Sequence, residues 1–598
     1  MLHTESIPSG SSHVRTTLNG PWRYAPDTPQ FAFGEHLGWM DPSFDDATWP
    51  EMEIPACWDL ADPALYGFEG YVWFRRTFVL PPAAAGFVFL ACEGVNYRAD
   101  VWLNGHYLGA HDGGFTPFRF RIDDYLAPQA ANSLVVRVDN RSLPDRLPGT
   151  RLSWFNYGGL YRDVFVEHQP AVHIADVTLD SRPRADGRSG SATIDVGVTL
   201  RNDGSTPFRG RLHLSLNDAT TDTDVQIEAN TETLVASTLQ LAEVEYWSPD
   251  HPSLHSLVME VTAADDVVDT LQMNIGVRRL ATDGARLLLN GEAMQIKGFN
   301  RHEDYPSTGR SHDQDLLRAD LQAIKETGAN FVRASHYPQH ARFYDACDEL
   351  GLMVMDEIPL WGWGREAASP DEPLPVDAAF HQLEEMVRRN RSRTCVVIWS
   401  VSNETGGGQA LIDRTNSELM QRVRQLDPTR LVTHVMLYRV WQELRDEAME
   451  ADDLLCLNEY EGSLNPDPPV RTRDDLPVAM TTLGQHLDAL HQRMPDKPVV
   501  ITEFGGIGLP GHHSDLPWSE ESYAETIRAH WQVFAERAWI VGALLWCWQD
   551  YPMHPNRVRS YPIGHYGVVS ADRIPKRACL DTVTRIFSSN QIESTVRS

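Results

Sequence analysis

Two glutamates, Glu404 and Glu503, each follow a short apolar run, in the segments CVVIWSVSNE and KPVVITEFG. The runs at 396–400 and 499–502 are rich in β-branched residues and too short for a helix, so they predict strands buried on both faces. A side chain at the C-terminal end of such a strand lies at the mouth of an α/β barrel, where that fold keeps its chemistry. Two carboxylates placed there could divide the acid–base and nucleophilic steps of glycosidic bond hydrolysis.

The elements that must position this pair follow an alternating strand and helix pattern, which implies parallel strands with crossover helices. One helix should run from Asp313 to Thr327, with its apolar residues on one face and Gly328 as its C-cap. Eight strands are the number that a closed (β/α)8 TIM barrel requires. The candidate strands are 294–299, 329–334, 352–356, 396–400, 431–435, 453–458, 498–502 and 541–546.

Polar residues follow most of these strands and would converge on one rim of the barrel. They occupy positions 300–304, 333–338, 356–357, 403–404, 458–460 and 503. Trp361 and Trp363 in PLWGWG fit either a substrate platform or loop packing. The arginines of the segment 388–393 predict a solvated surface.

Two β-rich zones precede the barrel zone, which spans residues 277–598. Residues 1–169 contain aromatic-rich alternating runs, and the Asn104–Gly105 pair in VWLNGHYL predicts a type I′ hairpin, because both turn positions need positive φ. This zone should be a β-sandwich. Residues 170–276 alternate with the length and strand spacing of an immunoglobulin-like sandwich, and we expect a spacer there.

Composition narrows the class of protein further. A chain of 598 residues exceeds a single core, and a net charge of −31 disfavours nucleic acid or an anionic membrane as partner. The seven cysteines lack CxxC spacing and predict free buried thiols in a reducing compartment. The N-terminal segment has no signal-peptide pattern, and no stretch reaches 18 apolar residues, so we expect a soluble cytoplasmic protein.

Two longer segments, NFVRASHYPQHARFYDACDELGLMVMDE and CVVIWSVSNE, resemble the signature segments of glycoside hydrolase family 2. The segment VWLNGHYLGAHDGGFTPF resembles the sugar-binding domain of that family. The resemblance covers essentially the whole chain. It implies a jelly-roll domain, an immunoglobulin-like domain and a catalytic TIM barrel in that order, which is the order of the three zones.

The resemblance also implies roles for single residues. Glu404 resembles the general acid/base and Glu503 the nucleophile of a retaining exo-β-glycosidase, whose carboxyl groups lie about 5–5.5 Å apart. We expect cationic or donor groups beside Glu503 and drier surroundings for Glu404. Asn403 is similar to the asparagine that binds the sugar 2-hydroxyl, and Tyr460 to the tyrosine bonded to the nucleophile. The candidate substrate-binding residues are His302, Arg333, His336, Asn403, Tyr460, Trp546, Arg559 and Tyr566.

The sugar is less well defined than the reaction. The β-glucuronidases of the family carry an Asn-x-Lys that grips the sugar carboxylate, and here the corresponding place resembles Gly564-His565-Tyr566. Arg557 or Arg559 could supply a replacement cation, since arginine binds carboxylates well. We therefore expect a terminal β-galactoside first. The alternatives are a β-glucuronide, a β-galacturonide, and another hexoside or furanoside.

The remaining expectations concern metals, assembly and catalytic competence. The Glu-x-His that binds magnesium in the large galactosidases is missing after Asp356-Glu357, so we expect no essential metal and no cofactor. The resemblance makes a homo-oligomer, a dimer or tetramer, the expected assembly, with a small glycoside or oligosaccharide as the only other partner. A non-catalytic carbohydrate-binding protein is the remote alternative, which the presence of both carboxylates disfavours.

Overall fold

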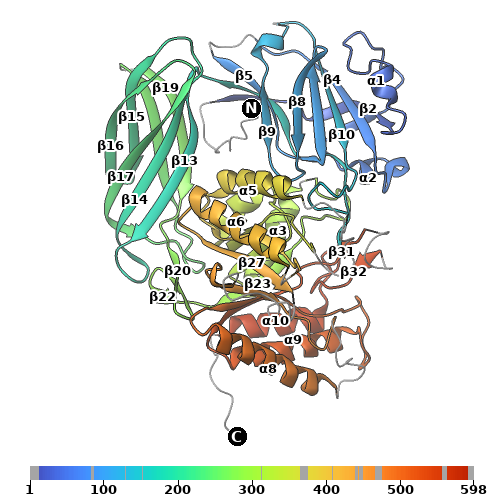
Figure 1. The fold of residues 1–598 in the computed structure, drawn as a ribbon, viewed down its shortest axis with the longest axis vertical. Helices are drawn as coiled ribbons and strands as arrows, with labels where there is room; N and C mark the ends of the chain where they lie inside the picture. Colours follow the sequence, from blue (N-terminus) through green and yellow to red (C-terminus); the bar gives the residue numbers. More distant parts are fainter. Residues whose placement is uncertain are drawn as a thin grey trace.

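The computed structural model shows two β-sandwiches side by side on one barrel (Figure 1). The described residues are 13–81, 86–127, 129–150, 152–264, 266–311, 313–363, 375–406, 409–437, 442, 449–464, 475–554 and 562–589. Helices α5 (Val376–Asn390) and α6 (Ala410–Leu426) lie on the side of the barrel nearest the sandwiches. The fold class expected from the sequence is confirmed.

The first sandwich packs a four-stranded sheet, in the order β1-β12-β5-β9, against a six-stranded sheet, in the order β3-β2-β4-β10-β7-β8. Leu90 of one sheet and Val136 of the other belong to the same core. Asn104 and Gly105, with φ of 52° and 81°, form the hairpin that the sequence predicts between β7 and β8. The elements are β1 (Val14–Thr17), β2 (Gly20–Asp27), α1 (Phe33–His36), β3 (Glu51–Ile54), α2 (Trp58–Ala61), η1 (Pro63–Leu65), β4 (Tyr71–Phe78), β5 (Phe87–Cys92), β6 (Val95–Asn96), β7 (Arg98–Leu103), β8 (His106–Asp112), β9 (Phe118–Arg121), η2 (Asp123–Tyr125), β10 (Asn132–Asp139), β11 (Gly159–Leu160) and β12 (Val164–Gln169).

The second sandwich packs the sheet β13-β14-β17 against the sheet β16-β15-β18-β19. Alternate residues of the long strands point inward, so that Leu200, Leu214 and Val261 are fully buried in its core. A three-stranded sheet, β20-β21-β22, leads from it to the barrel. The strands are β13 (Val172–Pro183), β14 (Ser189–Asn202), β15 (Phe208–Leu216), β16 (Ala219–Ile227), β17 (Thr231–Glu245), β18 (His255–Ala263), β19 (Asp266–Ile275), β20 (Leu280–Asp283), β21 (Arg286–Leu289) and β22 (Glu292–Ala293).

The barrel is closed, because its first strand pairs in parallel with both its second and its eighth. Each strand is fully buried or nearly so, which explains why their sequences read as short apolar runs without alternation. All eight strands lie where the sequence predicts them. They are β23 (Ile296–Arg301), β24 (Phe331–Ala334), β25 (Met353–Glu357), β26 (Val396–Asn403), β27 (Leu431–Leu437), β28 (Leu455–Asn458), β29 (Val499–Phe504) and β30 (Ile540–Leu545).

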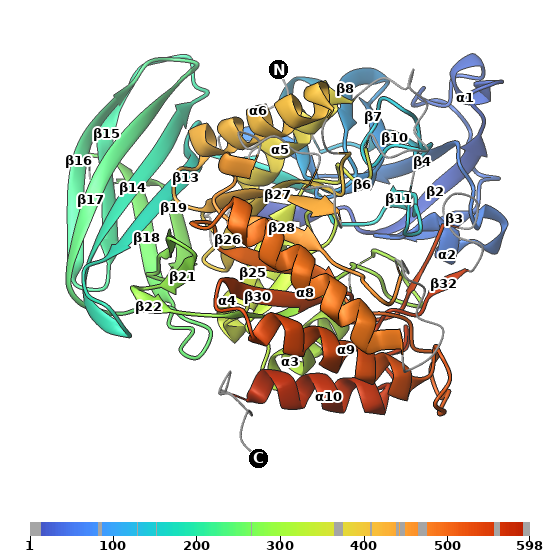
Figure 2. The same cartoon turned by 60° about the horizontal axis from the view of Figure 1, so that its bottom comes forward.

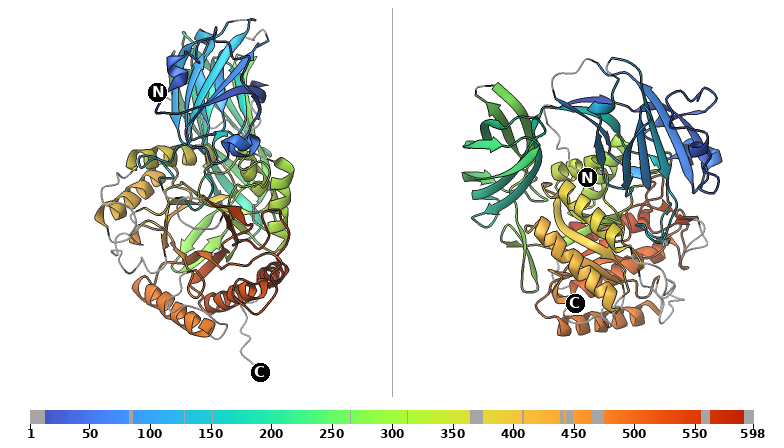
Figure 3. Two further views of the ribbon diagram at one scale, coloured as in Figure 1. Left: turned by 90° about the vertical axis from the view of Figure 1, so that its right-hand side faces the viewer. Right: turned by 45° about the horizontal axis from the view of Figure 1, so that its top comes forward.

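Helices cover the outside of the barrel (Figure 2). The first begins after Asp313, whose side chain accepts a hydrogen bond from the Leu316 amide, and it is followed by Gly328 with a φ of 86°. The last three helices lie side by side at the end away from the sandwiches (Figures 2 and 3). Besides α5 and α6, these elements are α3 (Gln314–Glu326), α4 (Ala341–Leu350), α8 (Leu476–Arg493), α9 (Glu520–Ala535), α10 (Arg577–Ser588) and the short strands β31 (Tyr551–Pro552) and β32 (Ile563–Gly564).

The arginine cluster after α5 is not the solvated surface that the sequence suggests, apart from the half-exposed Arg388. Arg389 donates to backbone carbonyls of the first sandwich and the barrel, and Arg391 pairs with Asp176 of the second sandwich. Arg393 pairs with Asp345 of the barrel. A charge run in sequence does not reveal which neighbouring domain will cover it.

The sequence also predicts free, buried cysteine thiols. This prediction is confirmed, since all seven cysteines are free and buried.

Candidate active site

Glu404 and Glu503 lie at the C-terminal ends of the fourth and seventh barrel strands, β26 and β29. Their residues are only 7% and 4% exposed. Glu404 has a φ of 52°, a left-handed conformation that costs a non-glycine residue roughly 1–2 kcal/mol. Its backbone amide donates to the Val435 carbonyl, 2.9 Å away in β27, which helps to hold this conformation. Such strain is common where a side chain must be aimed into a site.

Glu503 is held by donors on both carboxylate oxygens. Arg333 Nη1 donates to Oε1 at 2.7 Å and the Tyr460 hydroxyl donates to Oε2 at 2.5 Å. His336 Nε2 lies 3.8 Å from Oε1. Burial raises the pKa of Glu503 above its usual value, while Arg333, His336 and Tyr460 oppose that rise by favouring the ionised form. The cationic and donor surroundings expected for this carboxylate are present.

Arg333 is the centre of the polar network beneath Glu503. It is fully buried, and it forms a bidentate ion pair with Glu357, with its closest N–O distance at 2.7 Å. Burial alone would raise the pKa of Glu357, but Arg333 and His336 bring it below its usual value. Arg333 also donates to Asn300 and, at 2.8 Å, to Asn403. Because these contacts occupy its guanidinium, Arg333 positions the nucleophile candidate and is not a free cation for substrate.

Glu404 accepts a hydrogen bond from a neutral amide. Asn458 Nδ2 donates to Glu404 Oε1 at 3.0 Å and to Asn403 Oδ1 at 3.1 Å, and its own oxygen accepts from Thr502. The Oδ1 atom of Asn403 is therefore occupied by Arg333 and Asn458. Its Nδ2 atom is buried and has no hydrogen-bond partner among the described residues. That amide is available to a sugar hydroxyl.

Aromatic and imidazole rings form the wall of the site. Trp546 stacks on His336, with ring centroids 5.1 Å apart and an 18° angle between the planes, and His302 meets Trp546 edge-on at 5.4 Å. The Nδ1 atom of His302 lies 3.1 Å from the Tyr337 hydroxyl, and Nε2 has no partner among the described residues. Burial lowers the pKa of His302 well below its usual value, and His336 and nearby arginines add to that effect. A neutral His302 can accept or donate one hydrogen bond to a sugar.

Trp154, which the sequence did not single out, enters this wall from the first sandwich. Its ring lies 5.7 Å from His302, 5.6 Å from His336 and 6.0 Å from Trp361, and the residue is 2% exposed. No motif marks it, because only the packing of one domain on another brings it to the barrel. Trp361, in the loop after the third barrel strand, β25, lies in the same aromatic cluster, whereas Trp363 packs against the main core.

The same aromatic cluster includes part of the segment that departs from the glucuronidase pattern. Tyr566 is buried in the aromatic cluster, and His565 Nδ1 lies 3.1 Å from Asp550. The buried Lys576 also binds Asp550, at 2.6 Å, so that carboxylate already neutralises the nearest lysine. Arg557 and Arg559 lie outside the described residues. The structure thus brings together seven of the eight candidate substrate-binding residues, although Arg333 serves Glu503 and Glu357.

A closed parallel barrel with two carboxylates at the ends of its fourth and seventh strands is the architecture of a glycoside hydrolase. Three family models match the chain in succession: "Glycosyl hydrolases family 2, sugar binding domain" at 16–170, "Glycosyl hydrolases family 2" at 172–278, and "Glycosyl hydrolases family 2, TIM barrel domain" at 280–589. The chain therefore belongs to glycosyl hydrolase family 2, as its sequence motifs indicate.

Several curated relatives match nearly the whole chain. A β-glucuronidase from Paenibacillus borealis is 28% identical over 599 residues, covering 94% of this chain and 95% of that protein. A β-glucuronidase from Mus musculus is 26% identical over 616 residues, covering 96% and 90%. A β-galactosidase from Pectobacterium atrosepticum is 28% identical over 610 residues, which are 94% of this chain but 53% of that protein.

Solved structures agree with these relatives. A β-glucuronidase from Ruminococcus gnavus in complex with D-glucaro 1,5-lactone has a TM-score of 0.86 and 25% sequence identity, covering 98% of this chain and all of that one. The same enzyme in complex with C6-substituted uronic isofagomine gives the same values. Among the described residues, no helix is long and apolar enough to span a membrane.

Proposed function

We propose that this glycoside hydrolase is a retaining exo-β-glycosidase that acts by double displacement. We propose a terminal β-glucuronide as its preferred substrate. The observation that carries the reaction is the hydrogen bonding of Glu503 to Arg333 and Tyr460. Both groups favour the carboxylate over the carboxylic acid, and an ionised carboxylate is what attack on an anomeric carbon requires.

In the proposed first step, Glu503 attacks the anomeric carbon while Glu404 protonates the departing glycosidic oxygen. In the second step, Glu404 removes a proton from water, which releases the sugar from Glu503. Asn458 orients the Glu404 carboxyl by donating a hydrogen bond to its Oε1 atom. Asn403, whose Nδ2 is unpartnered among the described residues, is placed to bind the sugar 2-hydroxyl.

The relatives support a β-glucuronide better than the β-galactoside that the sequence places first. The curated β-glucuronidases from Paenibacillus borealis and Mus musculus match over 95% and 90% of their own length, and a matching solved β-glucuronidase is in complex with C6-substituted uronic isofagomine. A sugar carboxylate needs a cation, and Lys576 is occupied by Asp550. We assign that contact to Arg559, which the sequence places in the segment before Gly564.

A neutral β-galactoside is the second candidate. The observation in its favour is Tyr566, which stands where the family glucuronidases have the lysine of their Asn-x-Lys. A tyrosine hydroxyl can bond to a 6-hydroxyl but gives no charge to a carboxylate. A β-galacturonide has the carboxylate of the first candidate substrate and the galacto configuration of the second, so it belongs in the same test.

The test is a comparison of kcat/KM for nitrophenyl β-glucuronide, β-galacturonide and β-galactoside. The glucuronide should be the best substrate. Arg559→Ala should lower kcat/KM for uronides about 10- to 100-fold, the value of a hydrogen bond to a charged group, and leave the galactoside nearly unchanged. Arg557→Ala is the matched control and should change neither. A preference for the galactoside would overturn the uronide assignment. An enzyme that hydrolyses none of the three substrates would overturn the proposed activity.

A further inference from the structure

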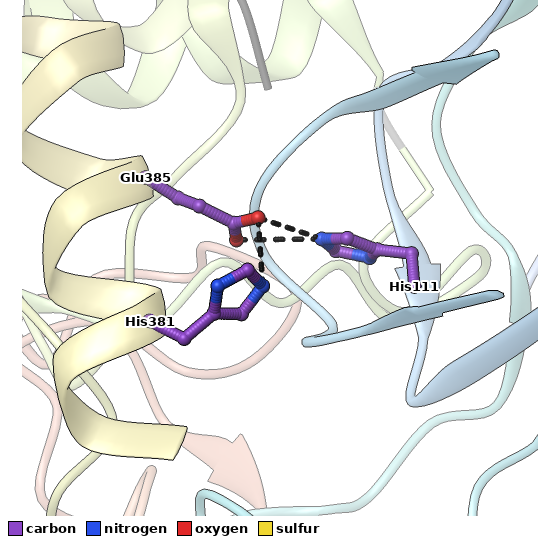
Figure 4. A group of neighbouring side chains, drawn as sticks. All are labelled: His111, His381 and Glu385. Atoms are coloured by element: carbon purple, nitrogen blue, oxygen red, sulfur yellow. Dashed lines mark hydrogen bonds and ion pairs between the residues drawn. The ribbon is translucent and has the colours of Figure 1, made fainter. Parts of the chain in front are cut away.

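Two histidines and a glutamate meet at the junction of the first sandwich and the barrel (Figure 4). His111 lies in β8 of the sandwich, while His381 and Glu385 lie in α5 of the barrel. The i, i+4 spacing of His381 and Glu385 puts both side chains on one face of the helix. The third side chain comes from the opposite domain. None of the three contacts Glu404 or Glu503 in the described network.

The three side chains converge on one small volume. Glu385 Oε1 lies 3.0 Å from His111 Nε2 and 3.1 Å from His381 Nε2. The ligand atoms of the group all lie within 4.8 Å of one another. Ligand atoms at about 2.0–2.1 Å from a tetrahedral ion lie roughly 3.4 Å from one another. Glu385 Oε1 would therefore have to move only slightly away from the two Nε2 atoms to admit a metal ion.

Neighbouring groups fix the direction of these ligands. The Thr116 hydroxyl donates to Glu385 Oε2 at 2.5 Å, and Oε2 also lies 3.3 Å from His111 Nε2, so Oε1 is the oxygen that is close to both imidazoles. The ring of His111 stacks on Phe118, with centroids 4.5 Å apart and planes 17° from parallel. Outer-shell partners that orient a carboxylate or imidazole are typical of built metal sites.

Access and burial also suit a bound ion. The side chains of His111 and Glu385 are 0% and 2% exposed, whereas that of His381 is 44% exposed. An ion could therefore enter from the His381 side and find two ligands already in place. A carboxylate and two imidazole nitrogens are ligands of the types that such an ion takes from proteins.

We propose that His111, His381 and Glu385 bind one divalent cation of the zinc class and that this ion ties the first sandwich to the barrel. Two imidazoles and one carboxylate suit zinc and its neighbours in the first transition row, and not magnesium or calcium, which prefer oxygen alone. The ion would bind Nε2 of each imidazole, so any proton on these two atoms would be released or moved to Nδ1. Its role is structural, because it joins residues 274 positions apart in the chain across a domain junction.

The experiment uses the full chain without a histidine tag, stripped with EDTA and titrated with Zn²⁺ by calorimetry and thermal unfolding. The wild type should bind one ion per chain and gain thermal stability, since an ion that binds only the folded state stabilises it. Losing a residue that only orients a metal ligand typically weakens metal binding about 10- to 100-fold. Because His381 would itself be a ligand, His381→Ala should weaken zinc binding by at least that factor. Its side chain is half-exposed, so the variant should fold without metal.

His106→Ala is the matched control, because His106 is an exposed histidine of the same strand and lies outside the group. It should bind zinc like the wild type. Glu385→Gln provides a second variant that keeps the shape of the side chain and should also lose the ion. The stripped wild type should keep its kcat, because the ion does not touch the reacting groups.

Three results would overturn the proposal. They are the absence of saturable zinc binding by the wild type, equal affinity in the wild type and His381→Ala, and a thermal shift that zinc produces equally in both. Any of these would leave the three side chains as a hydrogen-bonded contact between domains. Loss of kcat on stripping would overturn the structural role and would locate the ion's effect in catalysis, whichever sugar is the substrate.

Discussion

Glu503 and Glu404 lie on the same rim of the barrel, but their neighbours are of opposite character. Glu503 is held by a guanidinium and a phenol, within a buried network that extends to Glu357. Glu404 is held by the neutral amide of Asn458. One barrel can thus give two identical side chains different hydrogen-bond donors: Asn458 at the end of β28 serves Glu404, while Tyr460 two residues later and Arg333 of β24 serve Glu503. Three substitutions test whether this difference in neighbours corresponds to a difference in role.

Glu503→Gln should have the largest effect. It removes the proposed nucleophile while keeping the shape of the side chain, and kcat should fall by on the order of 10⁴- to 10⁶-fold, as in other covalent hydrolases that lose their nucleophile. Initial rates on the best aryl substrate measure the loss. Glu536→Gln, at an exposed position after α9, is the control and should be fully active. A Glu503→Gln enzyme that stays within tenfold of the wild type would refute the assigned role.

Glu404→Ala should lose less, and the loss should depend on the leaving group. General acid catalysis contributes about 10²- to 10⁴-fold where the departing oxygen needs a proton, so kcat/KM for an alkyl glycoside should fall by that amount. A nitrophenyl glycoside leaves easily and should retain much more of its kcat/KM. Equal losses on the two substrates would show that Glu404 is not the proton donor.

Tyr460→Phe should have the smallest effect. It removes one hydrogen bond to a charged carboxylate, worth about 1.5–3 kcal/mol, so kcat/KM should fall roughly 10- to 150-fold. Tyr460 favours the ionised form of Glu503, and its loss should raise the pKa of Glu503 further. The acidic limb of the pH profile of kcat/KM should therefore move to higher pH.

The control for this change is Tyr107→Phe, which removes a tyrosine hydroxyl bonded to Asp100 in the first sandwich. It should leave the profile in place. A Tyr460→Phe profile that stays where the wild-type profile lies would mean that Tyr460 does not bond to Glu503 in the working enzyme.

Local sequence predicts much of this molecule for a physical reason. Barrel strands must be apolar on both faces, sandwich strands must alternate, and the Asn104–Gly105 turn needs positive φ, so each pattern is visible within a few residues. The position of the two glutamates can be predicted in the same way, because the residue at the C-terminal end of a parallel barrel strand lies at the rim of the barrel. Their partners Tyr460 and Arg333 lie at other strand ends and were therefore within reach of the sequence.

Other features depend on which surfaces meet, and no local pattern records them. Trp154 reaches the active-site wall, and Arg389 becomes an interdomain donor, only because the first sandwich packs on the barrel. His111 and Glu385 likewise become neighbours across that junction. The sequence by itself thus determined the eight barrel strands, the order of the three domains and the two carboxylates proposed to react. Only the tertiary structure decided how the domains complete the site, because contacts between residues far apart in the chain arise from packing and not from periodicity.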